Sequence, residues 1–314
     1  MKKKALILGG TGGLSGRLAA LARDEYDVWA LTRGSKPPGD GIHPLVADRG
    51  DEAAFADAVC GAGRFDAVFD CICMNEDHAR QDLRVLPEVT DRLVVVSTDS
   101  VYDPDRKFTP QCESPAFFVE EAGSPETLGY AANKRRMEAV FEGYFADAGN
   151  MAVTIFRPGH IYGPGFLAGC YPEHSRQKDL PDRILRRDAL RLVAAGVYLI
   201  HPVFVDDLAL AMLDCVHKEK AFNRIFGIGG PEAVENRIYY ELMGKILGVP
   251  VTVEEVPLTG YADAHPEYAG HLNHRIYDLG ELKAAGVRMP DTPLEAGLRK
   301  HLSWLGYGPA PVAE

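Results

Sequence analysis

The sequence predicts an α/β protein with a doubly wound parallel sheet, followed by a smaller C-terminal α/β region that binds the substrate. Over the first 160 residues, short apolar stretches alternate with stretches of helical length, which is typical of successive β–α–β units. A glycine-rich turn follows the first apolar stretch, and hydroxyl and carboxyl side chains follow a later one. Ligands of such sheets bind beyond the carboxyl ends of the strands, so we expect the functional site there.

Residues 5–16, ALILGGTGGLSG, are expected to form a buried strand, a tight glycine turn and the start of an amphipathic helix. Glycines let the backbone approach a diphosphate, and the helix N-terminus points free N–H groups toward it. This order of elements predicts a Rossmann-type dinucleotide site. Two registers of the three-residue spacing fit, namely Gly9, Gly12 and Ser15, or Gly10, Gly13 and Gly16. The residues expected to bind the dinucleotide here are Gly9, Thr11, Gly12, Gly13, Leu14 and Ser15.

The ends of the next two strands point to the adenosine half of a dinucleotide. The strand predicted over 27–32 is followed by Arg33, where an acidic residue would bind a ribose 2′-hydroxyl and repel a 2′-phosphate. Arginine suits the 2′-phosphate, so we expect NADP as the cofactor, with NAD as the alternative. The strand predicted over 42–47 ends at Asp48, which is placed to accept a hydrogen bond from the adenine amino group.

The rest of the chain continues the pattern and then loosens. Further strands are predicted over 65–73, 92–96, 152–156, 224–228 and 251–256, and helices over 51–60, 76–86, 130–146, 179–195, 234–247 and 293–305. Residues 103–127 are expected to form a loop over the site. The Pro/Gly-rich RPGHIYGPG separates a dinucleotide-binding domain, 1–160, from a substrate-binding region, 161–314, partly interleaved with it. Asp206 and Asp207 are expected to cap the helix that follows them.

Tyr130 and Lys134 lie one turn apart on the same face of the helix predicted over 130–146. A Lys ammonium beside a phenol favours the phenolate, so the Tyr can exchange a proton with a substrate hydroxyl or carbonyl. The Lys can also hold the nicotinamide ribose. Thr98 follows the strand over 92–96 and is placed to polarise the same substrate oxygen. We therefore expect Thr98, Tyr130 and Lys134 to be catalytic.

Composition limits the partners that we expect. The net charge of −11 argues against nucleic acid. Six cysteines show no metal-ligand spacing, so we expect reduced thiols, no metal and a cytoplasmic protein. The apolar run after MKKK breaks at Gly9, which is too short for a signal peptide, and no run reaches membrane-spanning length. We expect no membrane partner.

Several segments together resemble the extended short-chain dehydrogenase/reductases, the NAD-dependent epimerase/dehydratase family. They are GGTGGLSG, STDSVYD, YAANK, RPGHIYGPG, FVDDLALAM and the C-terminal DTPLEAGLRKHLSWL, so the resemblance covers nearly the whole chain. It implies Thr98, Tyr130 and Lys134 as the catalytic set and favours the register that ends at Ser15. It also implies a sugar or nucleotide-sugar substrate and a homodimer formed through the helices at 76–86 and 130–146.

The resemblance and the strand ends supply the remaining site residues. Cofactor contacts are further expected from Cys71, Ser97 and Pro158, and substrate contacts from Ser100, His160, His201 and Arg275. His160 stands where sugar-nucleotide enzymes of the family usually have Asn. Arg275 is a candidate for the family's diphosphate-binding arginine, or else a solvated residue at a strand edge.

Asp99 and Ser100 stand where the 4,6-dehydratases have Asp-Glu, and STDSVYD is instead similar to the dTDP-4-dehydrorhamnose-type reductases. We expect an NAD(P)-dependent oxidoreductase or epimerase that acts on a carbonyl or secondary hydroxyl. The alternative is a catalytically silent NAD(P)-sensing or RNA-binding protein on the same fold.

Overall fold

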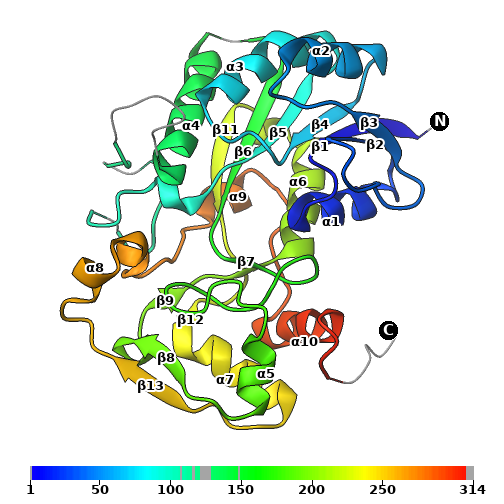
Figure 1. Cartoon of the computed structure of the whole chain (residues 1–314). Helices are drawn as coiled ribbons and strands as arrows, with labels where there is room; N and C mark the ends of the chain where they lie inside the picture. The colour runs from blue at the N-terminus through cyan, green and yellow to red at the C-terminus, as the bar shows by residue number, and fades with distance from the viewer. Residues whose placement is uncertain (1, 107, 115–116, 121–128, 148, 309–314) are drawn as a thin grey trace.

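We describe a computed structural model that covers residues 2–106, 108–114, 117–120, 129–147 and 149–308 (Figure 1). Its centre is a seven-stranded sheet in the order β11-β6-β5-β4-β1-β2-β3, and every pairing in it is parallel. The strands are β1 (Lys3–Leu8), β2 (Tyr26–Thr32), β3 (His43–Val46), β4 (Ala67–Asp70), β5 (Arg92–Val96), β6 (Ala152–Pro158) and β11 (Arg224–Ile228). The strand order reverses between β1 and β4, where such sheets bind ligands. The predicted Rossmann-type fold is confirmed.

Helices cover both faces of the sheet, because its central strands are apolar on both sides. In β1, Ala5 and Ile7 pack in one core cluster, whereas Leu6 and Leu8 pack in the opposite one. The first cluster is covered by α1 (Gly13–Ala22), α6 (Val205–Cys215) and α9 (Gly280–Ala284). The second is covered by α2 (Glu52–Gly61), α3 (Glu76–Val85) and α4 (Tyr130–Ala146).

A second region, drawn below the sheet in Figure 1, has a separate apolar core around Tyr239, Tyr240 and Leu298. Its helices are α5 (Leu180–Leu185), α7 (Asn236–Leu247), α8 (Tyr261–Ala264) and α10 (Leu294–Trp304). Its strands form three pairs, β7 (Ile161–Tyr162) with β10 (Val203–Phe204), β8 (Leu190–Val193) with β13 (Val253–Val256), and β9 (Leu199–Ile200) with β12 (Val234–Glu235). The chain enters this region after β6 and returns to the sheet as β11. The proposed division at residue 160 stays a prediction.

The helix predicted over 179–195 is wrong in its second half. The helix α5 ends at Leu185, and Arg187 takes a left-handed backbone conformation with φ of 62°. Residues 190–193 then form β8, which pairs with β13 and buries Leu190 and Leu192. Pairing with a distant strand decides the conformation here, and the local apolar pattern does not reveal it.

The strand predicted over 65–73 is shorter, and the predicted caps of α6 are wrong. The strand β4 ends at Asp70, because the Asp70 carboxylate accepts a hydrogen bond from the Ile72 N–H at 2.6 Å and turns the chain.

The N-cap of α6 is Phe204. Asp206 instead forms a two-point ion pair with Arg17 of α1, and Asp207 accepts two hydrogen bonds from Thr292. Both aspartates therefore join elements rather than cap a helix.

Candidate active site

The glycine turn after β1 is tied together by Ser15. The Ser15 hydroxyl accepts a hydrogen bond from Gly12 N–H at 2.9 Å and donates one to the Gly9 carbonyl at 2.5 Å. Gly9 has φ of 94°, and a Cβ there would lie 2.5 Å from the Ile72 side chain. A hydroxyl in the third position thus holds the turn from within. This geometry favours the register of Gly9, Gly12 and Ser15.

Two cavities meet at this turn. The central cavity, about 510 Å³, lies between the carboxyl ends of the strands and the lower region. The side cavity, about 590 Å³, lies over the ends of β2 and β3. Both are lined by Gly9, Gly12, Ile72 and Met74, so they adjoin. Their sizes are typical of ligand pockets, and together they offer the extended shape that a dinucleotide requires.

The side cavity holds the residues expected around adenosine. Thr11, Arg33 and Asp48 all line it, and Asp48 is fixed by a 2.9 Å hydrogen bond from the Gly50 N–H. Lys36 lines the same cavity as a second cation. Sequence reasoning missed Lys36, although its place in the loop after Arg33 was a usable signal.

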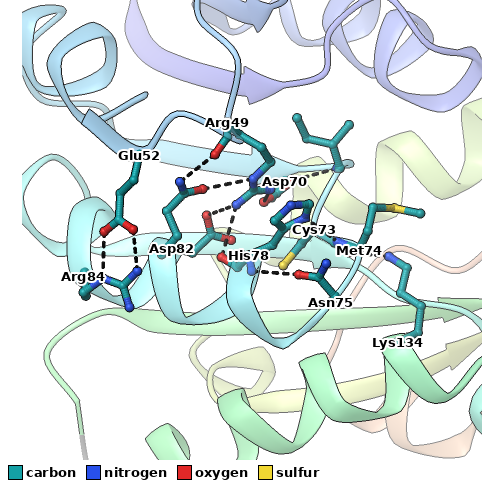
Figure 2. A network of polar contacts seen from close by, with 12 residues as sticks. Arg49, Glu52, Asp70, Cys73, Met74, Asn75, His78, Asp82, Arg84 and Lys134 are labelled. Atoms are coloured by element: carbon teal, nitrogen blue, oxygen red, sulfur yellow. Dashed lines mark hydrogen bonds and ion pairs between the residues drawn. The ribbon is translucent and has the colours of Figure 1, made fainter. Parts of the chain in front are cut away.

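Beside the side cavity, a buried ion network joins β4, α3 and the loop after β3. Arg49 donates to Asp70 and Asp82, both at 2.7 Å, and to Gln81 at 3.1 Å (Figure 2). Gln81 returns a 2.8 Å bond to the Arg49 carbonyl. Burial opposes the ionisation of Asp70, but the Arg49 charge holds the pKa of that carboxyl below its usual value. Burial and the neighbouring Asp70 raise the pKa of Asp82 well above its usual value.

The same network contains a group of possible metal ligands. Among the described residues, Asp70, Cys73 and Asp82 offer donor atoms within 4.8 Å of one another. The guanidinium of Arg49 already bonds both carboxyl groups, so it supplies the positive charge that a metal would bring. The chemistry of this donor set therefore does not fit a metal ion.

The expected catalytic residues Thr98 and Tyr130 meet at the central cavity. Thr98 lies just after β5, and Tyr130 begins α4. Both side chains line this cavity. Tyr130 is 52% exposed, at the wall of the cavity. Desolvation by burial raises the pKa of Tyr130, and the nearby Thr98 side chain acts in the opposite direction.

Lys134 lies one turn further along α4 and lines the same cavity. Its ammonium donates hydrogen bonds to the carbonyls of Cys73 at 2.6 Å and Val96 at 2.8 Å. Burial lowers the pKa of Lys134. These two bonds fix Lys134 between the ends of β4 and β5, so its charge lies under the site where a nicotinamide ribose would bind. The predicted direct contact with the phenol is replaced here by contacts with the main chain.

The helix that carries Tyr130 is anchored by a second buried ion pair. Arg157 of β6 donates to Glu138 of α4 at 2.9 and 2.8 Å, and both side chains are fully buried. Arg157 also donates to the Glu113 carbonyl at 2.7 Å. The first residue of RPGHIYGPG therefore fixes the position of α4, the helix that begins with Tyr130.

The opposite wall of the central cavity carries Asp99 and Arg275. Arg275 donates to Asp99 at 2.6 and 2.5 Å, and the Tyr277 hydroxyl also donates to Asp99. The Arg275 side chain is only 13% exposed. The alternative expectation, a solvated arginine at a strand edge, is therefore wrong. The charge of Arg275 is largely neutralised by Asp99, which weakens the expectation that it binds a diphosphate.

The structure separates the two predicted substrate histidines. His160 lines the central cavity, and its Nε2 is buried without a hydrogen-bond partner among the described residues. Burial, followed by the charges of Arg176 and Arg275, lowers the pKa of His160 to about 3, so the ring is neutral. His201 does not line this cavity. Its Nε2 donates to the Gly230 carbonyl at 2.7 Å and its Nδ1 accepts from Tyr277 N–H at 3.2 Å, which indicates a structural role.

The other predicted contacts lie together around the central cavity. Leu14, Gly13, Cys71, Ser97, Ser100 and Pro158 all line it. The Ser97 hydroxyl is buried without a partner among the described residues, so it is available to a ligand. Burial raises the pKa of Cys71, which therefore stays a thiol. Part of the loop expected over the site at 103–127, namely residues 107, 115–116 and 121–127, lies outside the described residues.

The Pro/Gly-rich segment 157–165 reaches the glycine turn from the lower region. Gly165 has φ of 96°, and a Cβ there would lie 2.9 Å from the Gly13 Cα. A Cβ on Gly13 would lie 2.8 Å from the Phe166 ring. The two glycines therefore allow the segment to close one end of the central cavity.

The parallel sheet, its switch point, the glycine turn and the Tyr/Lys helix define the class of dinucleotide-binding α/β proteins. The residues fit such a ligand, because a close-approach turn, an unpaired Ser97 hydroxyl and a buried Lys134 surround one continuous space. The sequence model of the NAD dependent epimerase/dehydratase family matches residues 5–229. The chain belongs to this family, which confirms the predicted resemblance.

Solved structures share the fold at low sequence identity. An epimerase from Methanothermobacter thermautotrophicus is 17% identical, with a TM-score of 0.76 over 97% of this chain and 92% of that one. UDP-glucuronic acid 4-epimerase from Bacillus cereus, in complex with NAD, is 16% identical, with a TM-score of 0.71 over 96% of both chains. dTDP-glucose 4,6-dehydratase from Bacillus anthracis, also with NAD, is 17% identical, with a TM-score of 0.71 over 97% and 96%.

A curated relative is the chloroplast stem-loop binding protein of 41 kDa b from Arabidopsis thaliana. It is 26% identical over 324 residues, which span 98% of this chain and 75% of that protein. Across the part of the chain that the structure describes, no helix is long and apolar enough to cross a membrane.

Proposed function

We propose that the protein is an NAD(P)-dependent oxidoreductase or epimerase that acts on a carbonyl or secondary hydroxyl of a sugar or nucleotide sugar. The observation that carries this proposal is that Tyr130 and Thr98 lie together at the wall of a cavity that reaches the glycine turn. Family membership supports NAD-dependent chemistry. Solved structures with the same fold include complexes of NAD with UDP-glucuronic acid and with UDP-glucose, which supports a nucleotide sugar as substrate.

In the proposed mechanism, Thr98 donates a hydrogen bond to the reacting oxygen of the substrate, and Tyr130 exchanges a proton with it. The cofactor, when bound, supplies or accepts the hydride. Lys134 holds the ribose and places a positive charge near the phenol, which lowers the cost of the phenolate. Ser97 and the glycine turn hold the cofactor in register with Tyr130.

Reduction or epimerisation is proposed rather than loss of water. Dehydration needs an acid and a base beyond Thr98, Tyr130 and Lys134. Asp99 is bonded to Arg275 and Tyr277, and the Ser100 hydroxyl is no base near neutral pH. Glu113 accepts from the Gly227 N–H and does not line the central cavity. Glu121, another carboxylate of the loop, lies outside the described residues.

The test is to titrate NAD and NADP in both redox states and then incubate the loaded protein with a panel of nucleotide sugars and keto-sugars. We expect a change in nicotinamide absorbance for a reduction, or a product of unchanged mass for an epimerisation. Mass spectrometry would show a product lighter by one water if the assignment of reaction type is wrong. Failure of both cofactors to bind would contradict the whole proposal.

A second candidate function is RNA binding, favoured by the likeness to the Arabidopsis stem-loop binding protein. The net charge of −11 opposes it, because RNA binding depends on neutralising phosphates. A filter-binding titration with stem-loop RNA at low and physiological salt tests this candidate. Tight, salt-dependent binding that competes with NAD would favour RNA binding over catalysis.

A further inference from the structure

The central cavity is positively charged, although the chain as a whole carries a net charge of −11. Among the described residues that line it, the charged side chains are Asp99, Lys134, Arg176 and Arg275. Asp99 and Arg275 cancel each other through their ion pair. Lys134 and Arg176 remain, and no other carboxylate lines the cavity in the described part of the chain. The cavity therefore suits a ligand with negative charge in addition to the cofactor.

Arg176 lines the central cavity as a cation. Among the described residues, its guanidinium has no carboxylate partner and lies over the Phe166 ring, 4.2 Å from the ring centre. Lys134, by contrast, donates two hydrogen bonds to main-chain carbonyls. Stacking on an aromatic ring fixes the plane of a guanidinium and leaves its N–H groups free to bind an anion.

The backbone of Arg176 has an unusual conformation. Its φ is 51°, in the left-handed region that residues with a side chain enter at a cost in free energy. Hydrogen bonds to the carbonyls of Gly169 and Ala168, made by Arg176 and the following Gln177, close the loop around it. Such a conformation persists only where surrounding structure enforces it, and it often marks a functional position.

Arg176 lines the central cavity together with Thr98 and Tyr130, and it does not line the side cavity that was assigned to adenosine. Its charge acts on the ionisation of Tyr130 and of His160. The neighbouring Ser175 and Tyr171 line the same wall. An anion held by Arg176 would therefore belong to a molecule that also reaches the Tyr130 phenol.

We propose that Arg176 binds an anionic group of the substrate, a phosphate, a diphosphate or a carboxylate, and so takes the role that sequence reasoning gave to Arg275. This rests on the proposed function and narrows it to anionic substrates. The cofactor's own diphosphate offers the same chemistry, so the experiment separates the two sources.

The test is calorimetric titration of UDP, UDP-glucuronic acid and inorganic diphosphate into protein saturated with NAD, which keeps these probes out of the cofactor site. In Arg176→Ala, we expect the Kd for the anion that wild type binds best to rise about 10- to 100-fold, the usual loss for a charge-assisted hydrogen bond. Arg176→Lys should recover part of the affinity. NAD binding should change by less than about two-fold in both variants.

Two further variants exclude a trivial loss of folding. Arg187 also has a positive φ, of 62°, but does not line the central cavity, so Arg187→Ala should bind the anions as wild type does. Arg176→Gly relieves the backbone strain, so it should melt at or above the wild-type temperature while binding the anions as weakly as Arg176→Ala.

Three results would overturn the inference. They are no binding of any of the three probes by NAD-saturated wild type, unchanged anion affinity in Arg176→Ala, and a fall in NAD affinity without a fall in anion affinity. The last result would assign Arg176 to the cofactor. Absence of NAD and NADP binding by wild type would count against the proposed function alone, and the Arg176 comparison would then be made on the cofactor-free protein.

Discussion

At the scale of single residues, the site depends on which polar groups are already satisfied and which are left open. Asp99 and Arg275 satisfy each other, and His201 has both ring nitrogens bonded to the main chain. Ser97 and His160 each keep a buried polar atom without a partner among the described residues. Unpaired buried polar atoms are costly, so their presence in one cavity indicates where a ligand completes the hydrogen bonding.

Tyr130→Phe is expected to lower turnover by at least about 100-fold, because it removes the proton that passes to the substrate oxygen. Cofactor affinity should be nearly unchanged, since the phenol makes at most one contact with the cofactor. Steady-state kinetics and cofactor titration on the same preparation measure both. Tyr171→Phe is the matched control, because Tyr171 lines the same cavity. Equal turnover in the two variants would remove Tyr130 from the mechanism.

Arg33→Ala is expected to weaken NADP binding about 10-fold or more and to leave NAD nearly unchanged, since only NADP carries the 2′-phosphate. Lys36→Ala should have a smaller effect of the same sign, because Lys36 lines the same cavity. Titrating both cofactors into each variant tests this. Equal affinity of wild type for the two cofactors would contradict the assignment of NADP.

At the scale of elements, buried ion pairs fix the strands and helices that carry the site. Arg49 joins the loop after β3 to β4 and α3, and Arg157 joins β6 to α4. A buried pair adds little net stability compared with apolar packing, but removing one partner is costly because it strands the other charge. These pairs specify position more than they add stability.

Arg49→Leu should lower the free energy of unfolding by about 3–5 kcal/mol at neutral pH, because it strands Asp70 beside Asp82. The loss should shrink as the pH falls toward about 5, since buried carboxyl groups without a cation have raised pKa values and favour the protonated, neutral form. Wild type should behave oppositely, because Arg49 holds the pKa of Asp70 low and that contribution is lost in acid. Urea denaturation at several pH values measures this.

The control for Arg49 is Arg84→Leu. Arg84 of α3 pairs with Glu52 of α2, and both side chains are exposed (Figure 2). Exposed pairs contribute little, so this variant should unfold almost as wild type does. If both variants lost a comparable free energy of unfolding, burial of the Arg49 network would not explain the loss.

Gly165→Ala should weaken cofactor binding about 10-fold, because its Cβ would lie 2.9 Å from Gly13 and push the segment away from the glycine turn. Gly248→Ala provides the control. Gly248 has a similar left-handed backbone, with φ of 77°, but nothing lies within 4 Å of its Cβ position. Gly248→Ala should lower stability and leave cofactor affinity intact. Equal cofactor affinity in the two variants would argue against the close approach.

Local sequence signals predicted the elements that carry their own pattern. The strand over 92–96 matches β5 and the helix over 130–146 matches α4 residue for residue, since apolar periodicity and flanking turn residues specify both. Residues 190–193 became a strand only through pairing with β13, which lies some distance along the chain. Likewise, Arg275 and Asp99 show no relation in sequence, and only the fold brings them into contact. Interactions between distant segments therefore account for the errors.

At the scale of the whole molecule, the predicted homodimer would use α3 and α4, which pack against each other on one face of the sheet. Light scattering after size-exclusion chromatography should give twice the chain mass of 34.3 kDa. Arg80→Glu and Arg136→Glu, on α3 and α4, should shift the protein toward monomers, because each variant reverses a charge on the helices of the proposed interface. A monomer for wild type at micromolar concentration would contradict the dimer.

The chain leaves the sheet after β6 and comes back as β11, and these two strands are neighbours. The intervening segment, which includes the loop of Arg176, thus begins at the carboxyl end of one strand and ends at the amino end of the parallel strand beside it. Insertions and deletions within it leave both anchors in place. In evolutionary terms, the chain can lengthen or reshape this segment without shifting the register of the strands that form the sheet. The segment can diverge in sequence and length while the sheet and its glycine turn are inherited unchanged.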